Sequence, residues 1–367
     1  MITNPEVSTE RSTWVLPPEA YSSAEWHDRE QRDLFGRTWV FVASVEQLAH
    51  PGDFVTTTIG HEPVLITRDK MGELHAFSNV CPHRGITLLD GCGNTEKGIV
   101  CPYHHWNFAL NGELRSVPQA EQFPELTKEE FGLYPVHLAE WGSSVFVNLA
   151  QDPEPFDQWM GAFPQSLGAH DPTRLVEVAH RQRVVDANWK FLVENTIEVY
   201  HLFYLHRTTQ DQYQNHLFDN WFDGWHWSSY TPLYDDRSFN EEESSIAWGE
   251  VTLPPWLGDR ENGGIFVHLI FPNMVLFITN RVFRIMTLIP EGPERCRIDL
   301  RTRAMPGTDP ALFEDEVNET FEEDVMACQR MQQGVRSSRF AVRTLAKDHE
   351  RPIGIFQSKL LAAMAAE

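Results

Sequence analysis

The sequence predicts an α+β protein with two domains: a small antiparallel β domain, followed by a curved antiparallel sheet with helices on one face. Three observations support this fold class. The chain has 367 residues, more than a single hydrophobic core usually organises. Short segments of alternating hydrophobicity fill the region from about residue 40 to residue 148. Four longer strand-like runs lie between residues 263 and 305, with helical patterns on both sides.

Residues 1–40 form a polar lead-in that we expect to pack on the second domain. One helix is expected here, from Ser23 to Trp39, because Ser23 is a good N-cap and apolar residues follow at helical intervals. The first twelve residues, MITNPEVSTERS, lack the basic segment and apolar stretch of an export signal. We therefore expect a cytoplasmic protein.

Residues 41–150 form the expected β domain. Its strand-like segments are FVASV, DFVTTTIG, PVLITRD, LHAFSNV and SVFVNL. Turns rich in glycine, proline, aspartate and asparagine separate them, which is typical of a compact antiparallel domain. The stretch QDPEPFDQW follows, and its prolines and acids indicate a domain boundary.

Residues 151–367 form the second domain. It begins with a segment that is expected to be mainly helical, from Val184 to His206. The four strand-like runs are GIFVHLIF, MVLFITN, VFRIMTLIP and RCRIDLRTRA. Helices are expected from Glu314 to Arg339 and from Pro352 to Ala366.

The chain is strongly acidic, with 53 acidic and 30 basic side chains and a formal net charge of −23. This charge would repel a phosphate backbone, so it argues against nucleic-acid binding. It would favour solubility, or attract a cationic substrate or a basic electron-transfer partner. The apolar runs are much shorter than the roughly 20 residues of a membrane span, so no membrane partner is expected.

Two cysteines and two histidines form a paired motif in the first domain. Cys81 and His83 belong to NVCPHRG, and Cys101 and His104 belong to CPYHHW, with seventeen residues between His83 and Cys101. Two Cys and two His occur both at structural zinc sites and in Rieske [2Fe–2S] centres. Each half supplies one thiolate and one imidazole, which suits a two-iron cluster with both cysteines on one iron and both histidines on the other. The sequence here resembles the Rieske domain family, in its CxHRG and CPYHxW boxes.

The remaining cysteines and one extra histidine are not expected to bind the cluster. His105 stands where that family more often has Gly or Ala, and we interpret it as a surface residue or a neighbour of the ligands. Cys92 is interpreted as a loop thiol. Cys296 and Cys328 stand alone and are expected to be packed in the interior, since five cysteines in so long a chain do not indicate a disulfide framework.

A second group of metal-binding residues lies in the second domain. His201 and His206 are five residues apart, so on a regular helix they would point about 140° apart. They can converge only where the helix is irregular or ends. A carboxylate from the acidic segment FEEDVMACQRMQQG would complete a 2-His-1-carboxylate site with open positions on a ferrous ion.

The two segments together resemble the catalytic domain of Rieske non-haem iron oxygenase α subunits. The resemblance rests on NWKxxxENxxExYHxxxxH and, about 120 residues later, EDxxxCxxxQxG, and it extends to WVFVAS, PVLITRD and HERPIGIFQ. It implies a helix-grip catalytic domain. It also implies that Asp324 is the third iron ligand, with Glu323 as the other choice.

The resemblance also assigns an electron-transfer role to Glu198. In this family an acid at this position bridges an iron-bound histidine of one subunit and a cluster-bound histidine of its neighbour, in a head-to-tail ring that is usually a trimer. The implied histidines are His201 or His206 on one side and His104 or His83 on the other. Many ring-dihydroxylating members have Asp here with longer spacing, whereas the ENxxExYH pattern looks like the branch that oxidises quaternary ammonium compounds.

The predicted function is therefore the oxygenase component of a multicomponent Rieske oxygenase. The resemblance implies a [2Fe–2S] cluster, a mononuclear Fe(II), O₂ as co-substrate and electrons from NAD(P)H through a separate reductase or ferredoxin. A small quaternary ammonium or alkylamine substrate with oxidative C–N cleavage is favoured. The alternative is a hydroxylase or dioxygenase of a benzoate-like or salicylate-like aromatic ring. A Rieske electron-transfer protein without oxygenase activity is the alternative of another class.

The aromatic segment NWFDGWHWSSY, residues 220–230, bears on the substrate. Its three tryptophans could hold a quaternary nitrogen by cation–π attraction or stack on an aromatic ring. They could equally pack the sheet or a subunit boundary.

Overall fold

The computed structural model describes residues 14–167, 170, 172–234, 264–279, 282–313, 319–340 and 344–365. The chain forms two compact units. One is Glu30–Glu154, and the other combines the chain before residue 30 with the chain from Pro155 onward. The sequence prediction set these boundaries at residues 40 and 150. The N-terminal segment expected to be free of an export signal lies outside the described residues.

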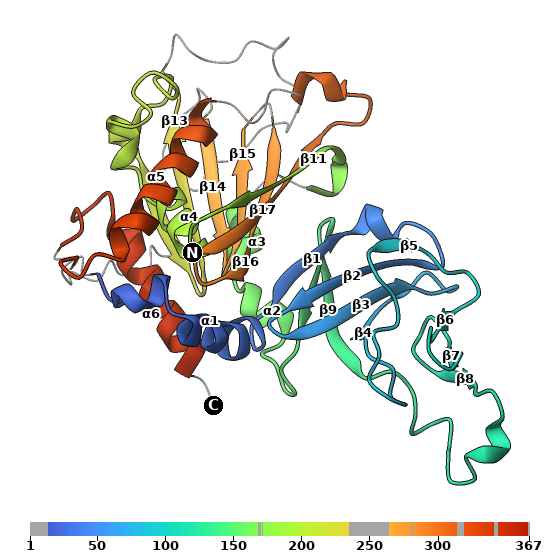
Figure 1. Ribbon diagram of the computed structural model, residues 1–367. Coiled ribbons are helices and arrows are strands. Elements are labelled where there is room, and N and C mark those ends of the chain that lie inside the picture. The colour runs from blue at the N-terminus through green and yellow to red at the C-terminus, as the bar shows by residue number, and fades with distance from the viewer. Residues whose placement is uncertain are drawn as a thin grey trace. The chain divides into compact units, whose positions relative to one another are not determined.

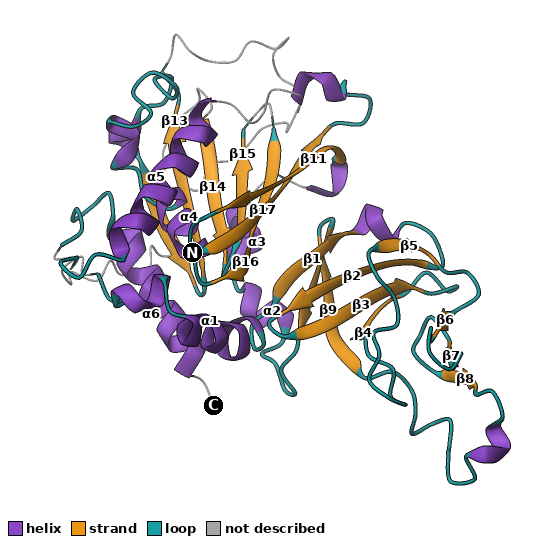
Figure 2. Ribbon diagram, in the orientation of Figure 1, coloured by secondary structure: helices purple, strands orange, loops and turns teal. Residues whose placement is uncertain are grey.

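The smaller unit is an antiparallel β structure (Figures 1 and 2). Its larger sheet has the described strand order β1-β10-β9-β4-β3-β2-β5, and a smaller sheet has the order β6-β7-β8. The strands are β1 Val40–Ser44, β2 Asp53–Ile59, β3 Glu62–Arg68, β4 Leu74–Ser78, β5 Cys92–Asn94, β6 Ile99–Val100, β7 Asn107–Phe108, β8 Leu114–Ser116, β9 Pro135–Trp141 and β10 Ser144–Asn148. The expected alternating segments are thus strands, as the period of two requires.

The larger unit is built on a second antiparallel sheet, with the described strand order β11-β17-β16-β15-β14-β13-β12. Its strands are β11 Val176–Val185, β12 Asp219–Asp223, β13 His226–Pro232, β14 Gly264–Ile270, β15 Met274–Ile278, β16 Phe283–Gly292 and β17 Arg295–Ala304. The four expected strand runs are β14 to β17. The sequence prediction missed β11, β12 and β13 as strands.

The helices are α1 Ala24–Glu30, α2 Phe156–Met160, α3 Phe163–Ser166, α4 Trp189–Thr196, α5 Glu319–Val335 and α6 Arg351–Ala365. Figure 2 shows α4 and α5 in front of the larger sheet, and α4 contacts β16, β17, α5 and α6. The predicted α+β class, with a curved antiparallel sheet and helices against it, is confirmed. No helix in the described part of the chain combines the length and hydrophobicity needed to cross a bilayer.

Two predicted helices were too long. The first was expected to run from Ser23 to Trp39, but α1 ends at Glu30 and is followed by one π-helical turn, Gln31–Phe35. The amide and the hydroxyl of Thr38 both donate to the carbonyl of Leu34, at 3.0 and 2.9 Å, just after this turn. The second was expected from Val184 to His206, but its start belongs to β11 and α4 ends at Thr196.

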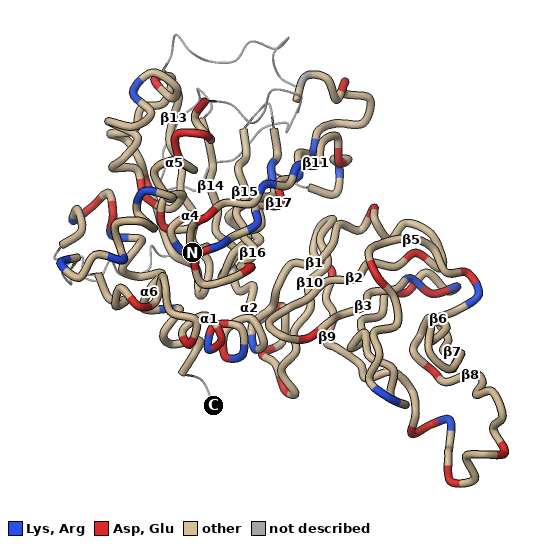
Figure 3. The backbone as a smooth tube through the Cα atoms, viewed as in Figure 1, with Lys and Arg blue, Asp and Glu red and all other residues tan. Residues whose placement is uncertain are grey.

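The two faces of the larger sheet differ in polarity. On β17, Ile298 and Leu300 line a cavity on one face, so Arg297, Arg301 and Arg303, which alternate with them along the strand, point to the other face. Figure 3 shows the basic residues along β11 and β17. Arg301 donates to Glu177 and Asp299 there, both at 2.9 Å. The cavity-facing side of β17 is therefore apolar, although the strand is rich in arginine.

Candidate active site

The four predicted cluster residues lie on two loops of the smaller unit. Cys81 and His83 follow β4, and Cys101 and His104 lie between β6 and β7. Both cysteines are buried, each 1% exposed, in the hydrophobic core of this unit. The two imidazole rings are 4.7 Å apart, and the ring of His83 stacks on Trp106. The structure thus brings the two halves of the motif together.

The polar atoms of this group fit a bound cluster. The Nδ1 atoms of His83 and His104 are buried and have no hydrogen-bond partner, an arrangement that is costly unless another group satisfies them. Burial raises the pKa of the Cys81 thiol to about 11, and contact with the neighbouring Cys101 sulfur adds to this rise. Two buried thiols and two buried, unsatisfied imidazole nitrogens are the donor set that a [2Fe–2S] cluster with mixed ligands requires.

The two ligand loops have the same backbone turn, and His105 stands in one loop where Gly85 stands in the other. The amide of Gly85 donates to the carbonyl of Cys81 at 2.9 Å, and the amide of His105 donates to that of Cys101 at 3.0 Å. Both Gly85 and His105 adopt positive φ, +74° and +58°. The side chain of His105 is exposed. Its backbone has a conformation that glycine adopts without strain.

Replacing His105 by glycine is therefore expected to leave the cluster intact. The variant should keep its iron and acid-labile sulfide content and its visible spectrum. Its stability should rise by up to about 1 kcal/mol, because the left-handed conformation is strained for a non-glycine residue. Spectra and thermal unfolding of His105→Gly, with His104→Ala as the variant expected to lose the cluster, measure this. A bleached His105→Gly protein would show that His105 holds the iron.

The second predicted site forms where α4 ends. Asn188 caps the helix by accepting from the amide of Lys190 at 3.0 Å, and Ile197 is its C-cap. Beyond it the Glu198 carboxylate accepts from the backbone amides of Tyr200 and His201. These side-chain bonds favour a turn over further helix. Glu198 was expected on the helix, one turn before His201, but it lies just past the helix end.

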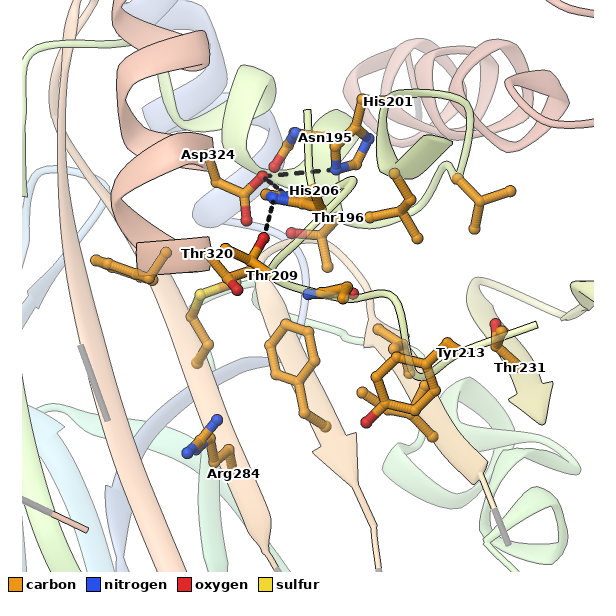
Figure 4. Close-up of a pocket in the computed structure, with 18 of the residues that line it drawn as sticks. Asn195, Thr196, His201, His206, Thr209, Tyr213, Thr231, Arg284, Thr320 and Asp324 are labelled. Atoms are coloured by element: carbon orange, nitrogen blue, oxygen red, sulfur yellow. Dashed lines mark hydrogen bonds and ion pairs between the residues drawn. The ribbon is translucent and has the colours of Figure 1, made fainter. Parts of the chain in front are cut away.

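Three side chains converge at this turn (Figure 4). The Nε2 atom of His206 lies 2.8 Å from Oδ1 of Asp324, and Nε2 of His201 lies 3.5 Å from the same oxygen. One ligand atom from each of these residues lies within 4.8 Å of the others. Because the helix ends first, the two histidines converge despite their spacing of five. Asp324 comes from α5, so the site joins two distant segments of the chain.

The other ring nitrogens of the two histidines are held by separate carboxylates. Nδ1 of His206 lies 2.7 Å from Oε2 of Glu323, which also accepts from the Thr209 hydroxyl at 2.8 Å. Nδ1 of His201 contacts Oε1 of Glu198. Both Nε2 atoms are left to face Asp324. Glu323 thus orients a histidine, a role that the sequence prediction did not assign to it, and Thr209 was missed entirely.

The electrostatics of the site favour a bound cation. Burial alone would lower the pKa of His201, but Asp324 and Glu198 outweigh it and raise that pKa to about 9. The pKa of His206 is also raised, since Asp324 and Glu323 outweigh its burial. Burial would raise the pKa of Asp324, and the two imidazoles lower it instead. Three carboxylates around two imidazoles therefore favour positive charge at this point, which a divalent metal bound by these ligand types would supply.

Several residues that lie away from the histidine and aspartate side chains hold α4 in place. The Tyr21 hydroxyl and the Gln357 side chain both donate to Oε1 of Glu194, at 2.6 and 2.9 Å. The amide of Asn188 donates to Gln332 of α5 at 2.8 Å. These buried bonds fix α4 against α5 and α6, and so fix the turn that carries His201 and His206.

A cavity of about 500 Å³ opens beside the three converging residues. The concave face of the sheet and the segment after α4 line it. Its aromatic lining residues are Tyr213, Phe218, Phe277, Phe313 and Phe321. Sequence reasoning did not single out these residues. Phe321 opens the acidic segment FEEDVMACQRMQQG, and the other four lie in ordinary apolar or turn segments.

The tryptophans of residues 220–230 are not among the described residues that line this cavity. Trp221 donates to the hydroxyl of Ser166 at 3.4 Å, and Trp227 is buried and donates to Asn220 at 3.4 Å. Trp225 stacks on Phe271, and the ammonium of Lys359 lies 5.7 Å from its ring centroid. The three indoles therefore pack the β12–β13 hairpin, in agreement with the packing interpretation of this segment.

Sequence comparison identifies both domains. The Rieske [2Fe–2S] domain profile matches residues 38–131, and the profile of the ring hydroxylating alpha subunit (catalytic domain) matches residues 172–366. The carnitine monooxygenase oxygenase subunit of Acinetobacter pittii is 33% identical over 200 residues, 54% of this chain and 53% of that protein. The chloroplastic choline monooxygenase of Beta vulgaris is 27% identical over 345 residues, 90% of this chain and 71% of that protein.

Solved structures share the fold. A quaternary ammonium Rieske monooxygenase, described for carnitine oxidation by gut microbiota and inter-subunit electron transfer, superposes with a TM-score of 0.82 at 24% identity, covering 96% of this chain and 95% of that one. Naphthalene 1,2-dioxygenase from Rhodococcus sp. gives 0.79 at 20% identity, with the same coverage. The chain spans about half the length of the carnitine monooxygenase subunits that it matches. The chain belongs to the ring-hydroxylating oxygenase α subunits, which carry a Rieske [2Fe–2S] domain and a catalytic domain.

Proposed function

We propose that this chain is the oxygenase component of a Rieske monooxygenase that hydroxylates a quaternary ammonium compound next to nitrogen and thereby cleaves a C–N bond. The observation that carries the proposal is the convergence of His201, His206 and Asp324 beside a cavity lined by aromatic side chains. The names of the carnitine, choline and glycine betaine monooxygenase relatives support the same substrate class. An electron-transfer protein would not need a second convergent ligand set.

In this proposal the chain holds two iron centres. His201, His206 and Asp324 would bind a mononuclear Fe(II), which when bound supplies the activation of O₂. Cys81, His83, Cys101 and His104 would bind the [2Fe–2S] cluster. Glu323 and Glu198 orient the two iron-binding imidazoles through Nδ1, an arrangement that fixes the ring tautomers and leaves both Nε2 atoms directed at the site.

Glu198 would also carry electrons between subunits of a head-to-tail trimer. Its carboxylate is 9% exposed, contacts Nδ1 of His201 and accepts from two backbone amides, so about one of its roughly four lone-pair sites is left to accept an N–H from a cluster histidine of a neighbouring chain. Exposed tyrosines flank both ends of this proposed contact: Tyr103, 52% exposed, precedes His104, and Tyr204, 71% exposed, follows His201. Large exposed aromatic residues are enriched at protein interfaces.

The aromatic lining and the acidic residues suit the substrate. A quaternary nitrogen is attracted to aromatic faces, by about 2 kcal/mol when water is excluded. Oxidation would place one oxygen atom of O₂ into a C–H bond next to nitrogen and release the other as water, with two electrons from NAD(P)H through a separate reductase or ferredoxin. The resulting carbinol would break its C–N bond to give an aldehyde and an amine. We place this activity in the cytoplasm, in keeping with five free cysteines.

A single-turnover experiment tests the function without the redox partner. Protein with both iron centres is reduced with dithionite, freed of excess reductant and mixed with O₂ and one test compound. Glycine betaine, L-carnitine or choline is expected to speed cluster reoxidation and to yield aldehyde in proportion to the active sites. Benzoate and salicylate represent the alternative, ring hydroxylation. If they give hydroxylated product and the ammonium compounds give no aldehyde, the proposed substrate class is wrong.

A further inference from the structure

The charged side chains that line the cavity are unevenly distributed. Glu198, His201, His206 and Asp324 gather at one end. Among the described lining residues, Arg284 is the one arginine, and no lysine is present. Figure 4 shows Arg284 on a strand at the opposite end of the drawn site from His201, His206 and Asp324. The cavity therefore has an anionic, metal-binding end and a cationic end.

The strand register directs Arg284 into the cavity. It is the second residue of β16, where Arg284 and Met286 line the cavity and Ile285 between them does not. Its neighbour on β15 is Phe277, another lining residue. A guanidinium among the apolar residues on this face of β16 breaks the hydrophobic pattern of VFRIMTLIP, which was the signal available in the sequence.

The surroundings of Arg284 strengthen its electrostatic effect. Phe277, Met286 and Leu300 are neighbouring lining residues, and apolar surroundings lower the local dielectric. The charge of Arg284 acts on the buried Tyr213, where burial raises the pKa of the phenol and the guanidinium opposes that rise. A guanidinium has five N–H donors in a planar fork, so it can bind a carboxylate through two parallel bonds beside its other contacts.

We propose that Arg284 binds a carboxylate group of the substrate and so holds the opposite, oxidised end of the molecule against His201, His206 and Asp324. This rests on the proposed function and narrows its substrate class to betaines, which are zwitterions. Choline carries the same trimethylammonium group but no carboxylate, so it cannot form this ion pair with Arg284. The aromatic side chains between the two ends would enclose the quaternary nitrogen.

Binding to the reduced holoenzyme without O₂ tests the assignment, because no turnover is involved. Calorimetry compares two matched pairs: glycine betaine with choline, and γ-butyrobetaine with butyltrimethylammonium. Wild type is expected to prefer the carboxylate member of at least one pair. Arg284→Gln should weaken binding of that member by about 10- to 100-fold, the usual effect of a lost charge-assisted hydrogen bond, and should not weaken binding of its partner, a cation that lacks the carboxylate.

Two further variants complete the design. Arg284→Lys keeps the charge but loses the planar guanidinium, and we expect a loss of carboxylate-ligand affinity between those of wild type and Arg284→Gln. This variant replaces Arg284→Gln in the test if Arg284→Gln does not fold. Arg295→Gln removes an exposed arginine of β17 that pairs with Glu291 at 3.3 Å, and it should bind all four compounds as wild type does. Equal weakening of both members of a pair, or no weakening, overturns the role of Arg284 while quaternary ammonium binding stands. Binding of none of the four compounds overturns the proposed function itself, and with it this assignment.

Discussion

Changing His201 to alanine is expected to reduce oxygenation to background while leaving the visible spectrum of the [2Fe–2S] cluster unchanged. Nε2 of His201 is one of three convergent donors, and a ferrous ion left with His206 and Asp324 alone would be bound weakly and in the wrong geometry. The cluster residues lie in the other compact unit, so their spectrum should not respond. Iron analysis should find the cluster irons retained and the third iron per chain lost.

Glu323→Gln is the matched control for this variant. Glu323 contacts Nδ1 of His206 rather than the centre where the Nε2 atoms meet. Its loss should weaken iron binding by about 10- to 100-fold, which is typical for a residue that orients a ligand, and excess Fe(II) should restore turnover. A His201→Ala protein that keeps its third iron and its turnover would remove His201 from the ligand set. A Glu323→Gln protein that excess iron cannot rescue would move Glu323 into it.

Changing Glu198 to glutamine is expected to stop electron delivery between the two metal centres. Because Glu198 also orients His201, iron binding should weaken by about 10- to 100-fold, so the variant is measured with its iron site filled by excess Fe(II). Glutamine keeps the size of the side chain and one carbonyl acceptor. It lacks the second anionic oxygen that a bridge between two imidazole N–H groups uses. In a single turnover the cluster should stay reduced after O₂ and substrate are added, at a rate at least about 100-fold below wild type. Stopped-flow absorbance of the cluster measures this directly.

Two controls separate bridging from a local structural effect. Glu350→Gln removes a nearby acid whose pKa is raised by burial and by the charge of Glu198. The cluster of this variant should reoxidise at the wild-type rate. Mixed oligomers of Glu198→Gln and His104→Ala chains should regain activity, because an intact cluster in one chain then faces an intact Glu198 in its neighbour. Wild-type reoxidation in Glu198→Gln would disprove the bridge, and absence of activity in mixed oligomers would disprove transfer between subunits.

The strands and the paired Cys/His motif could be predicted because each depends on the pattern of a few neighbouring residues. Alternation with a period of two is a property of a few consecutive residues, and it located β14 to β17 correctly. The β11 strand was partly misread as helix, because an edge strand with exposed and half-buried positions lacks a clear apolar alternation. Helix ends were also misplaced, at Ser23–Trp39 and Val184–His206. At the second, bonds from the backbone amides of Tyr200 and His201 to the Glu198 side chain favour a turn over further helix.

By itself, the sequence determined the family, the fold class and the residue types available for two metal sites, since these depend on composition and short spacings. Only the tertiary structure decided that Asp324 of α5 faces both His201 and His206 while Glu323 contacts the other ring nitrogen of His206, more than a hundred residues away in the chain. Strand pairing likewise decided that Arg284 faces the cavity and that the tryptophans of 220–230 do not line it. The physical reason is that such choices depend on which faces of distant segments are buried together, and local periodicity carries no information about that pairing.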